Sequence, residues 1–242
     1  MEPAEYDLMD AAEERMWWYR ALHARVLYAL AARPGPPGAV LDAGCGTGGL
    51  LRRLAVLGRP LAGLDVNPAA AARAAAKSGA LAAAGDANRL PFADASFAAL
   101  VSCDVLCHRA VEPARALAEF RRVLMPGGTL VLNLPAYQWL HSAHDVRVHN
   151  DRRFTAAGAR ALLRQAGFAG IEARYWNALL LPLMVVQRKV LRAGEAAASD
   201  VAPFPAWLDA ALHAVTAAER FLARLGLRYP AGGSILLVAT RP

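Results

Sequence analysis

Residues 40–49 read VLDAGCGTGG, and this stretch decides the fold. The apolar run Ala39–Asp42 predicts a buried strand, and leucines at helical spacing from Gly48 to Leu57 predict a helix directly after it. Glycines between a strand and a helix let the backbone turn sharply and approach a ligand closely. Their spacing alone leaves the ligand open, because three of them also satisfy the GxGxxG pattern of dinucleotide-binding loops: Gly44, Gly46 and Gly49.

The charge beside the loop separates two kinds of ligand. A dinucleotide places a doubly anionic pyrophosphate at this turn, and Asp42, two residues before the first glycine, would repel it at short range. S-adenosylmethionine (SAM) has no phosphate and carries a sulfonium and an ammonium group, both of which a carboxylate stabilises. Asp42 therefore favours SAM.

Two further aspartates end the next two predicted strands. Asp65 closes the strand Pro60–Asp65, about twenty residues beyond the loop, where a carboxylate can accept both ribose hydroxyls. Asp86 follows the strand Ala80–Gly85 and can accept from the adenine amino group. An aspartate at such a place is often only a helix cap, but three in succession favour a nucleoside ligand.

The rest of the chain continues to alternate between strands and helices. Repeated strand–helix–strand order predicts a parallel sheet that is covered on both faces, with ligands bound beyond the carboxyl ends of the strands. The further predicted strands are Phe97–Cys103, Thr129–Leu134, Gly170–Trp176 and Ser234–Thr240. The further predicted helices are 11–32, Pro68–Lys77, Glu112–Leu124 and Thr155–Ala166, the last capped by Thr155.

We expect one domain, 1–242, with four parts. These are an N-terminal helical cap (1–38), a Rossmann-like core (39–176), a helical insertion (177–233) and a last strand (234–242). The insertion holds two helical patterns, Ala178–Arg192 and Pro205–Leu225. It could cap the substrate mouth, form a dimer surface, or lie on a membrane with basic residues at its rim: Arg188, Lys189 and Arg192.

Residues 39–135 resemble the class I SAM-dependent methyltransferase family, in its type 11 group. The motifs that carry the resemblance are VLDAGCGTGG (40–49), LDVNP (64–68), GDANRLPFADASF (85–97), LVSCDVLCH (100–108) and LAEFRRVLMPGGTLVLNLP (117–135). The flanks resemble one subset of that group, through ERMWWY (14–19), HDVRVHNDRRFT (144–155) and PAGGS (230–234). The usual histidine before the tryptophans is Met16 here.

The resemblance implies an α/β fold: a Rossmann-like, seven-stranded, mostly parallel sheet with helices on both faces, an antiparallel last strand and a helical insertion between strands six and seven. It implies a SAM-dependent methyltransferase that methylates an O, N or C atom of a small-molecule acceptor. The implied cofactor-binding residues are Asp42, Gly44, Cys45, Gly46, Gly48, Asp65, Val66, Asp86, Ala87, Cys103, Trp18 and Tyr19. Two alternatives stay open: a lipid-linked acceptor at the membrane surface, and non-methylating chemistry such as cyclisation.

Methyl transfer is an in-line displacement, so the protein must mainly align the reactants and exclude water. A general base is needed only where the acceptor atom carries a proton. The catalytic candidates follow the fourth and fifth strands: His108, His144, Asp145 and His149. His144 beside Asp145 is the preferred base, although the aspartate could instead cap a turn. Arg152 and Arg153 could bind an anionic group or pair with acids.

Composition limits the partners. The net charge is +7 with a pI of about 9.8, but no block of five like charges occurs, so we expect a solvated basic surface and no nucleic-acid partner. The three cysteines form no CxxC, which favours a reducing compartment and no metal site. The acidic N-terminus lacks a signal pattern, and the longest apolar run, Ala178–Val186, is too short to span a bilayer. We expect a cytoplasmic monomer or homodimer, with membrane-surface attachment open.

Overall fold

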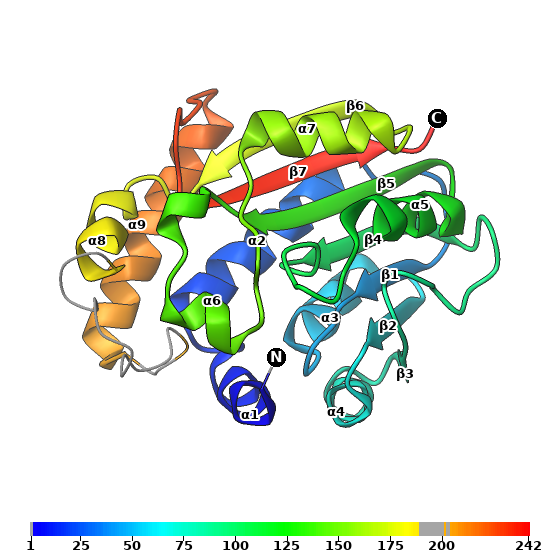
Figure 1. Ribbon diagram of the computed structural model, residues 1–242, viewed down its shortest axis with the longest axis horizontal. Coiled ribbons are helices and arrows are strands. Elements are labelled where there is room, and N and C mark those ends of the chain that lie inside the picture. Colours follow the sequence, from blue (N-terminus) through cyan, green and yellow to red (C-terminus); the bar gives the residue numbers. More distant parts are fainter. Residues whose placement is uncertain (1, 189–200, 202–203) are drawn as a thin grey trace.

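The computed structural model describes residues 2–188, 201 and 204–242, and places a seven-stranded sheet between layers of helices (Figure 1). The strand order is β3-β2-β1-β4-β5-β7-β6, and every pairing is parallel except the two made by β7. The strands are β1 Val40–Ala43, β2 Leu61–Asp65, β3 Leu81–Ala84, β4 Phe97–Cys103, β5 Leu124–Pro135, β6 Ala169–Trp176 and β7 Ser234–Thr240. The predicted fold, including the antiparallel last strand, is confirmed.

The helices cover both faces of the sheet. They are α1 Pro3–Ala12, α2 Trp17–Ala32, α3 Gly49–Leu54, α4 Pro68–Ser78, α5 Pro113–Val123, α6 Ala143–Arg147, α7 Ala156–Gln165, α8 Leu181–Val186 and α9 Ala206–Arg224, with 3₁₀ turns η1 Ala55–Leu57 and η2 Gln138–Leu140. The predicted cap of α7 is confirmed, because the backbone N–H of Gly158 donates to Thr155 Oγ1 at 3.1 Å.

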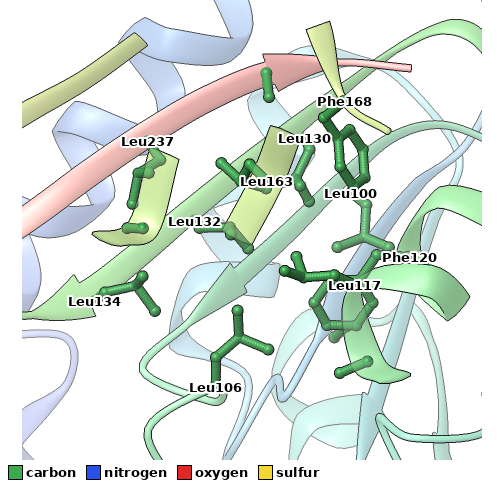
Figure 2. Packing of buried hydrophobic residues seen from close by; sticks show 14 of the residues in the cluster. Leu100, Leu106, Leu117, Phe120, Leu130, Leu132, Leu134, Leu163, Phe168 and Leu237 are labelled. Carbon is green, nitrogen blue, oxygen red and sulfur yellow. The ribbon is translucent and has the colours of Figure 1, made fainter. Parts of the chain in front are cut away.

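The core forms two layers because successive strand residues point to opposite faces. On one face Leu100 and Leu130 pack with Phe120 of α5 and Leu163 of α7 (Figure 2). On the other face the neighbouring residues of the same strands pack against α2 and α3: Val101 and Val131 meet Leu22, Val26, Leu50 and Leu54. Burial of each large aliphatic side chain contributes about 1.5–3 kcal/mol, so these layers hold the strand ends in place.

The N-terminal segment differs from the single helix predicted over residues 11–32. It contains two helices, α1 and α2, and the helical conformation is interrupted by a turn at residues 13–16. No local side chain caps α2; instead the backbone N–H of Trp17 donates to Asp209 of α9 at 2.7 Å. Asp209 also pairs with Arg20 at 2.6 Å. The sequence pattern missed this boundary because its cap lies far away in the chain.

β5 also begins earlier than predicted. The sequence placed its start at Thr129, after Pro126-Gly127-Gly128, but the strand runs from Leu124 and pairs there with Phe97 of β4. The register shifts between Phe97 and Ala99, so the glycine turn is accommodated as an irregularity within the strand rather than before it.

The helical insertion is joined to α2 by a buried ion pair. Glu219 of α9 and Arg25 of α2 approach to 3.0 Å, and Glu219 also accepts the backbone N–H groups of Asn177 and Ala178, each at 2.7 Å. Arg25 lies over the ring of Trp176, 4.5 Å from its centre. Helix α9 is therefore fixed against α2, on the left side of Figure 1.

The second predicted helix of the insertion, Pro205–Leu225, is confirmed as α9. The first, Ala178–Arg192, is represented by α8, and its end lies outside the described residues together with Lys189 and Arg192. Within the described part of the chain, no helix combines the length and the hydropathy that crossing a membrane requires.

Candidate functional site

One cavity of about 780 Å³ lies at the carboxyl ends of the parallel strands. Its walls come from the loops after β1, β2, β3, β4 and β5, from α1 and α2, and from the helical insertion. This is the edge at which sheets of this topology bind ligands. Eleven of the twelve predicted cofactor residues and all four predicted catalytic residues line it; the exception is Gly48.

The glycine loop approaches its neighbours too closely for any other residue. Gly44 has a φ of 90°, and a Cβ there would lie 2.1 Å from Cγ2 of Val105. Gly48 has a φ of 94°, and its Cβ would lie 2.6 Å from Cα of Ala74 in α4. Gly44 thus lets the loop after β4 close over the cavity, whereas Gly48 lets α3 pack against α4.

Asp42 presents a buried carboxylate to the cavity, and no salt bridge to it is formed within the described part of the chain. The residue is 1% exposed, and its Oδ2 has no hydrogen-bond partner among the described residues. Burial, together with the negative charges of Glu13 and Asp65, raises the pKa of Asp42 to about 8. A bound cationic group would satisfy this oxygen and favour its ionised form.

Asp65 is held in place by three donors. Its Oδ2 accepts from the backbone N–H of Gly46 at 3.0 Å, and its Oδ1 accepts from the Tyr6 hydroxyl at 3.0 Å and the Asn67 N–H at 2.9 Å. A carboxylate has about four acceptor positions, so one stays open for a ligand. The aspartate is therefore oriented before any ligand binds.

The sequence analysis missed the residues that α1 brings to the loop. The Tyr6 hydroxyl donates a hydrogen bond to Asp65. The methyl carbon of Met9 packs against Gly46, since a Cβ on that glycine would lie only 2.6 Å from it. Lys77 of α4 binds both Asp10 and Glu13, which fixes α1 over the loop. The signal was present, because Pro3 is typical of a first helical turn and Tyr6 and Met9 follow at helical spacing.

The other predicted cofactor residues surround the same space. The carboxylate of Asp86 accepts from the backbone N–H of Asn88 at 2.8 Å and is exposed to solvent. Trp18 and Tyr19 form an edge-to-face pair, with ring centres 5.1 Å apart. Burial raises the pKa of the Cys45 and Cys103 thiols, so both stay protonated at neutral pH. Val66 and Ala87 complete the set.

Asp104 is a cavity residue that the sequence analysis did not select. It follows β4 with a φ of 54°, and Nδ2 of Asn133 donates to its Oδ1 at 3.1 Å and its Oδ2 at 3.0 Å. The pKa of Asp104 is raised to about 7, because burial outweighs the opposing effects of the Asn133 hydrogen bond and the charge of Arg153. The rule that selected Asp42 and Asp65, an acid directly after a buried strand, would have found it.

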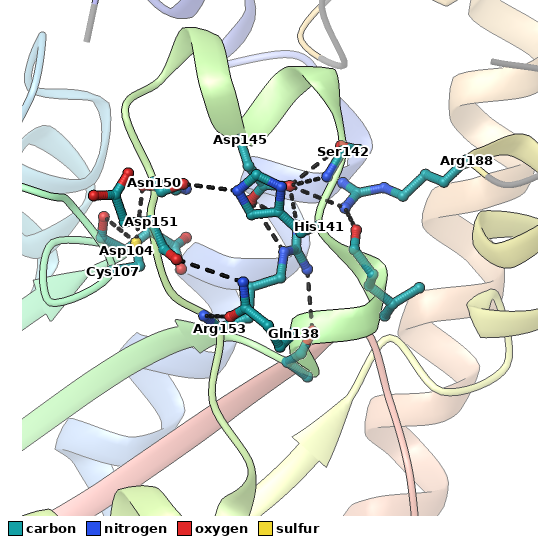
Figure 3. A network of polar contacts seen from close by, with 12 residues as sticks. Asp104, Cys107, Gln138, His141, Ser142, Asp145, Asn150, Asp151, Arg153 and Arg188 are labelled. Carbon is teal, nitrogen blue, oxygen red and sulfur yellow. Dashed lines mark hydrogen bonds and ion pairs between the residues drawn. The ribbon is translucent and has the colours of Figure 1, made fainter. Parts of the chain in front are cut away.

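The carboxylate of Asp145 forms ion pairs with two arginines, Arg153 and Arg188 (Figure 3). Arg153 donates through Nε and Nη2, each at 3.0 Å, and Arg188 of the insertion lies 3.6 Å away. Asp145 also caps α6 by accepting the N–H of Ser142 at 2.9 Å. Burial opposes its ionisation, but the arginines hold the pKa of Asp145 below its usual range. Of the options left open by the sequence, Asp145 caps a turn and Arg153 pairs with an acid.

The candidate histidines lie around the same loop. Burial lowers the pKa of His108 to about 4, so its imidazole is neutral at pH 7 and can accept a proton. His144 and His149 also line the cavity, and His149 has a φ of 58°. Arg152 holds the loop after β4 instead of an anion. Its Nη1 donates to the carbonyls of Leu106, His108 and Val111 at 3.1, 3.0 and 2.6 Å.

Comparison with known proteins agrees with this geometry. Residues 41–132 match a family model described as a methyltransferase domain. A "Probable S-adenosylmethionine-dependent methyltransferase" from Mycolicibacterium smegmatis is 31% identical over 162 residues, covering 65% of this chain and 61% of that protein. Residues 41–132 belong to this family of methyltransferase domains. The cofactor of this methyltransferase family is SAM, and the acidic strand ends described above fit it.

Two further relatives extend the comparison. A demethylmenaquinone methyltransferase from Beutenbergia cavernae is 40% identical over 128 residues, covering 52% of this chain and 50% of that protein. A Haloferax volcanii chain solved in complex with a methyltransferase activator is 26% identical with a TM-score of 0.63, covering 99% of this chain and 95% of that one. The chain spans no more than about three fifths of the length of the curated relatives it matches.

Proposed function

We propose that this chain transfers the methyl group of SAM to a small-molecule acceptor. The observation that carries the proposal is Asp42, a buried carboxylate that lines the cavity with one oxygen unpaired among the described residues. A cationic ligand satisfies such a group and favours its ionised form, whereas a pyrophosphate would oppose that ionisation. Bound SAM supplies an activated methyl group on a positively charged sulfur.

The residues of the glycine loop and the acidic strand ends would hold this cofactor. Asp42 faces its cationic groups, Asp65 is oriented to accept from a ribose hydroxyl, and Asp86 has an exposed carboxylate for the adenine end. Gly44 and Gly46 line the cavity with backbone atoms alone, because they carry no side chain of their own. Trp18 and Tyr19 cover the site from α2 and exclude water from it.

For an acceptor that carries a proton, Asp104 is the group best placed to take it. Asp104 follows β4, the strand beside β1, and its pKa of about 7 lets it exist as a carboxylate at neutral pH. His108 is the second candidate, since it is neutral, although a pKa of about 4 makes it a weaker base. His144 and His149 remain candidates through their place in the cavity wall. We assign Asp145 to holding the loop.

Calorimetric titration with SAM and, separately, with NADH tests the cofactor assignment. We expect micromolar binding of SAM and no binding of NADH. Asp42→Asn should weaken SAM binding at least tenfold, because a neutral amide cannot balance the cationic ligand. Asp94→Asn is the matched control, since that side chain is 77% exposed and pairs with Arg122 outside the cavity. Tighter binding of NADH than of SAM would contradict the proposal.

The identity of the reaction follows from product mass. A methyltransferase adds one CH₂ to its acceptor, whereas a SAM-dependent cyclase leaves the mass unchanged. The relative from Beutenbergia cavernae is named for demethylmenaquinone, so quinones belong in the acceptor screen beside phenols, amines and lipid-linked compounds. An acceptor that is consumed without a mass gain would point to the cyclisation alternative.

A further inference from the structure

The cavity extends well beyond the glycine loop, and its far side is built by the helical insertion. In the sheet order, β4 separates β1, β2 and β3 from β5, β7 and β6. Most of the predicted cofactor residues lie at the ends of the first group of strands, whereas the insertion joins β6 to β7 at the other end. Asp104, after β4, lies between the two sides.

The part of the cavity wall that the insertion provides consists mostly of apolar side chains. The side chains that line it come from α8, from α9 and from the residues just before each helix: Leu180, Leu183, Met184, Phe204, Leu208 and Leu212. None of the six residues of α8 is buried, and Leu183 is 55% exposed although its helix is apolar throughout. Such a surface is stabilised when an apolar molecule covers it.

Three charged side chains among the described residues of the insertion are engaged with other partners. Glu219 binds Arg25 and backbone N–H groups, and Asp209 binds Arg20 and the N–H of Trp17. Arg188, at the rim, pairs with Asp145 and donates to the carbonyl of Leu140 at 2.8 Å. The wall therefore offers little to balance a charged ligand.

One polar side chain on this wall lacks a partner. Asn177 lines the cavity and is 0% exposed, and neither Oδ1 nor Nδ2 of its amide has a hydrogen-bond partner among the described residues. Its backbone is held at a φ of 57° while its N–H donates to Glu219. Met184, a flexible side chain, lies beside it against Gly233. A buried amide without partners is costly, and a ligand with a hydroxyl or carbonyl group would satisfy it.

We propose that the insertion side of the cavity is the acceptor subsite, and that it binds an uncharged molecule with an apolar body and a hydroxyl or carbonyl group that pairs with Asn177. The assignment of this molecule as the methyl acceptor rests on the proposed function. The apolar body lies against α8 and α9, and the polar group points away from them toward the end of β6.

Alkylphenols are suitable probes, titrated into full-length protein that is saturated with S-adenosylhomocysteine. From phenol to 4-ethylphenol to 4-butylphenol, we expect affinity to rise about three- to fourfold for each added methylene. Leu208→Gln should flatten this rise. Leu225→Gln is the matched control, because that leucine is 70% exposed at the end of α9 and does not line the cavity.

A second comparison isolates Asn177. The wild-type protein should bind 4-propylphenol about tenfold more tightly than propylbenzene, and Asn177→Gly should abolish that difference. Glycine tolerates the positive φ, so this variant removes the amide without straining the backbone. Binding of S-adenosylhomocysteine should stay unchanged in all these variants.

The results separate the two proposals. Two outcomes, each with normal S-adenosylhomocysteine binding, would overturn the acceptor subsite alone. In one, alkylphenol affinity does not depend on the length of the alkyl chain. In the other, Leu225→Gln rather than Leu208→Gln removes the increase of affinity with chain length. A phenol preference that survives in Asn177→Gly would overturn the role of the amide. Failure of the wild-type protein to bind S-adenosylhomocysteine would instead contradict the proposed function.

Discussion

The indole Nε1 of Trp176 donates a hydrogen bond to Oδ1 of Asn133 at 2.8 Å, deep in the protein. Because an indole N–H can only donate, this contact fixes which way the amide faces. The Nδ2 group of Asn133 must then point to the carboxylate of Asp104, as the distances of 3.1 and 3.0 Å show. A residue at the end of β6 thus orients the candidate base after β4.

Trp176→Phe removes this donor and leaves Oδ1 of Asn133 buried without a partner. We expect the free energy of unfolding to fall by about 2 kcal/mol or more, measured by urea denaturation. The pKa of Asp104 should rise above 7, which carbon-13 NMR of labelled aspartate carboxyls can follow. Trp139→Phe is the control, because Trp139 is 51% exposed, and it should change stability by less than about 0.5 kcal/mol.

The two raised aspartate pKa values predict how stability depends on pH. Asp42 and Asp104 titrate near 8 and 7 in the folded protein but near 4 when unfolded. Between pH 6.5 and 8 the folded state therefore binds more protons, and stability falls as pH rises. His23 and His108 oppose this fall near pH 6.5, because their pKa is about 4 in the folded protein and about 6.5 when unfolded, and their effect fades as the pH rises to 8. The midpoint of urea denaturation should fall from pH 6.5 to 8, and it should fall less in Asp42→Asn. An equal fall in that variant would show that Asp42 does not contribute to the pH dependence of stability.

Glu219→Ala tests the joint between α9 and α2. The change leaves Arg25 buried without its acid and removes the acceptor of the Asn177 and Ala178 N–H groups, so it should cost about 3–5 kcal/mol. Asp151→Ala is the comparison, since its pair with Arg109 is about half exposed at 3.4 Å and should contribute less than about 1 kcal/mol. Similar costs in urea denaturation would mean that the buried pair does not join the helices.

Gly48→Ala and Gly79→Ala form a matched pair of substitutions. Both glycines have a positive φ, 94° and 72°, so each change costs about 1–2 kcal/mol of backbone strain. A Cβ on Gly79 meets nothing within 4 Å, whereas one on Gly48 lies 2.6 Å from the Ala74 backbone. Thermal unfolding should show a distinctly larger loss for Gly48→Ala, and equal losses would contradict close packing of α3 on α4.

The thiols offer a simple solution test. Burial raises the pKa of Cys45, Cys103 and Cys107, so thiolate is scarce at pH 8. We expect iodoacetamide to modify all three at least a hundredfold more slowly than free cysteine, as followed by mass spectrometry, and rapidly once urea unfolds the protein. Fast modification of the native protein would show that the cavity opens to solvent.

The sequence predicted the fold because its signals are local. A parallel strand buried on both faces is a short apolar run, and β4 and β7 match their predicted ranges to the residue. The acids at strand ends were equally readable, since Asp42, Asp65 and Asp86 each follow such a run. These features depend on neighbouring residues only.

The acceptor side could not be predicted because long-range contacts define it. Asn177 has an unremarkable sequence context, and its unpaired amide is visible only when the insertion folds against β6. The pairing of Asp145 with Arg153 and Arg188 likewise depends on two segments meeting. Sequence adjacency is a poor guide to side-chain pairing where the backbone turns.

Asp209 supplies the cap of α2 from the other end of the chain, and this has a consequence during synthesis. The ribosome makes α2 early, but the acid that satisfies its first N–H group emerges only after nearly the whole sheet has been translated. Until then the start of α2 frays, and Trp18 and Tyr19 are not held over the cavity. The ligand site is therefore completed among the last events of folding, and a ribosome-stalled chain that ends before residue 209 should carry a formed sheet edge without its cover.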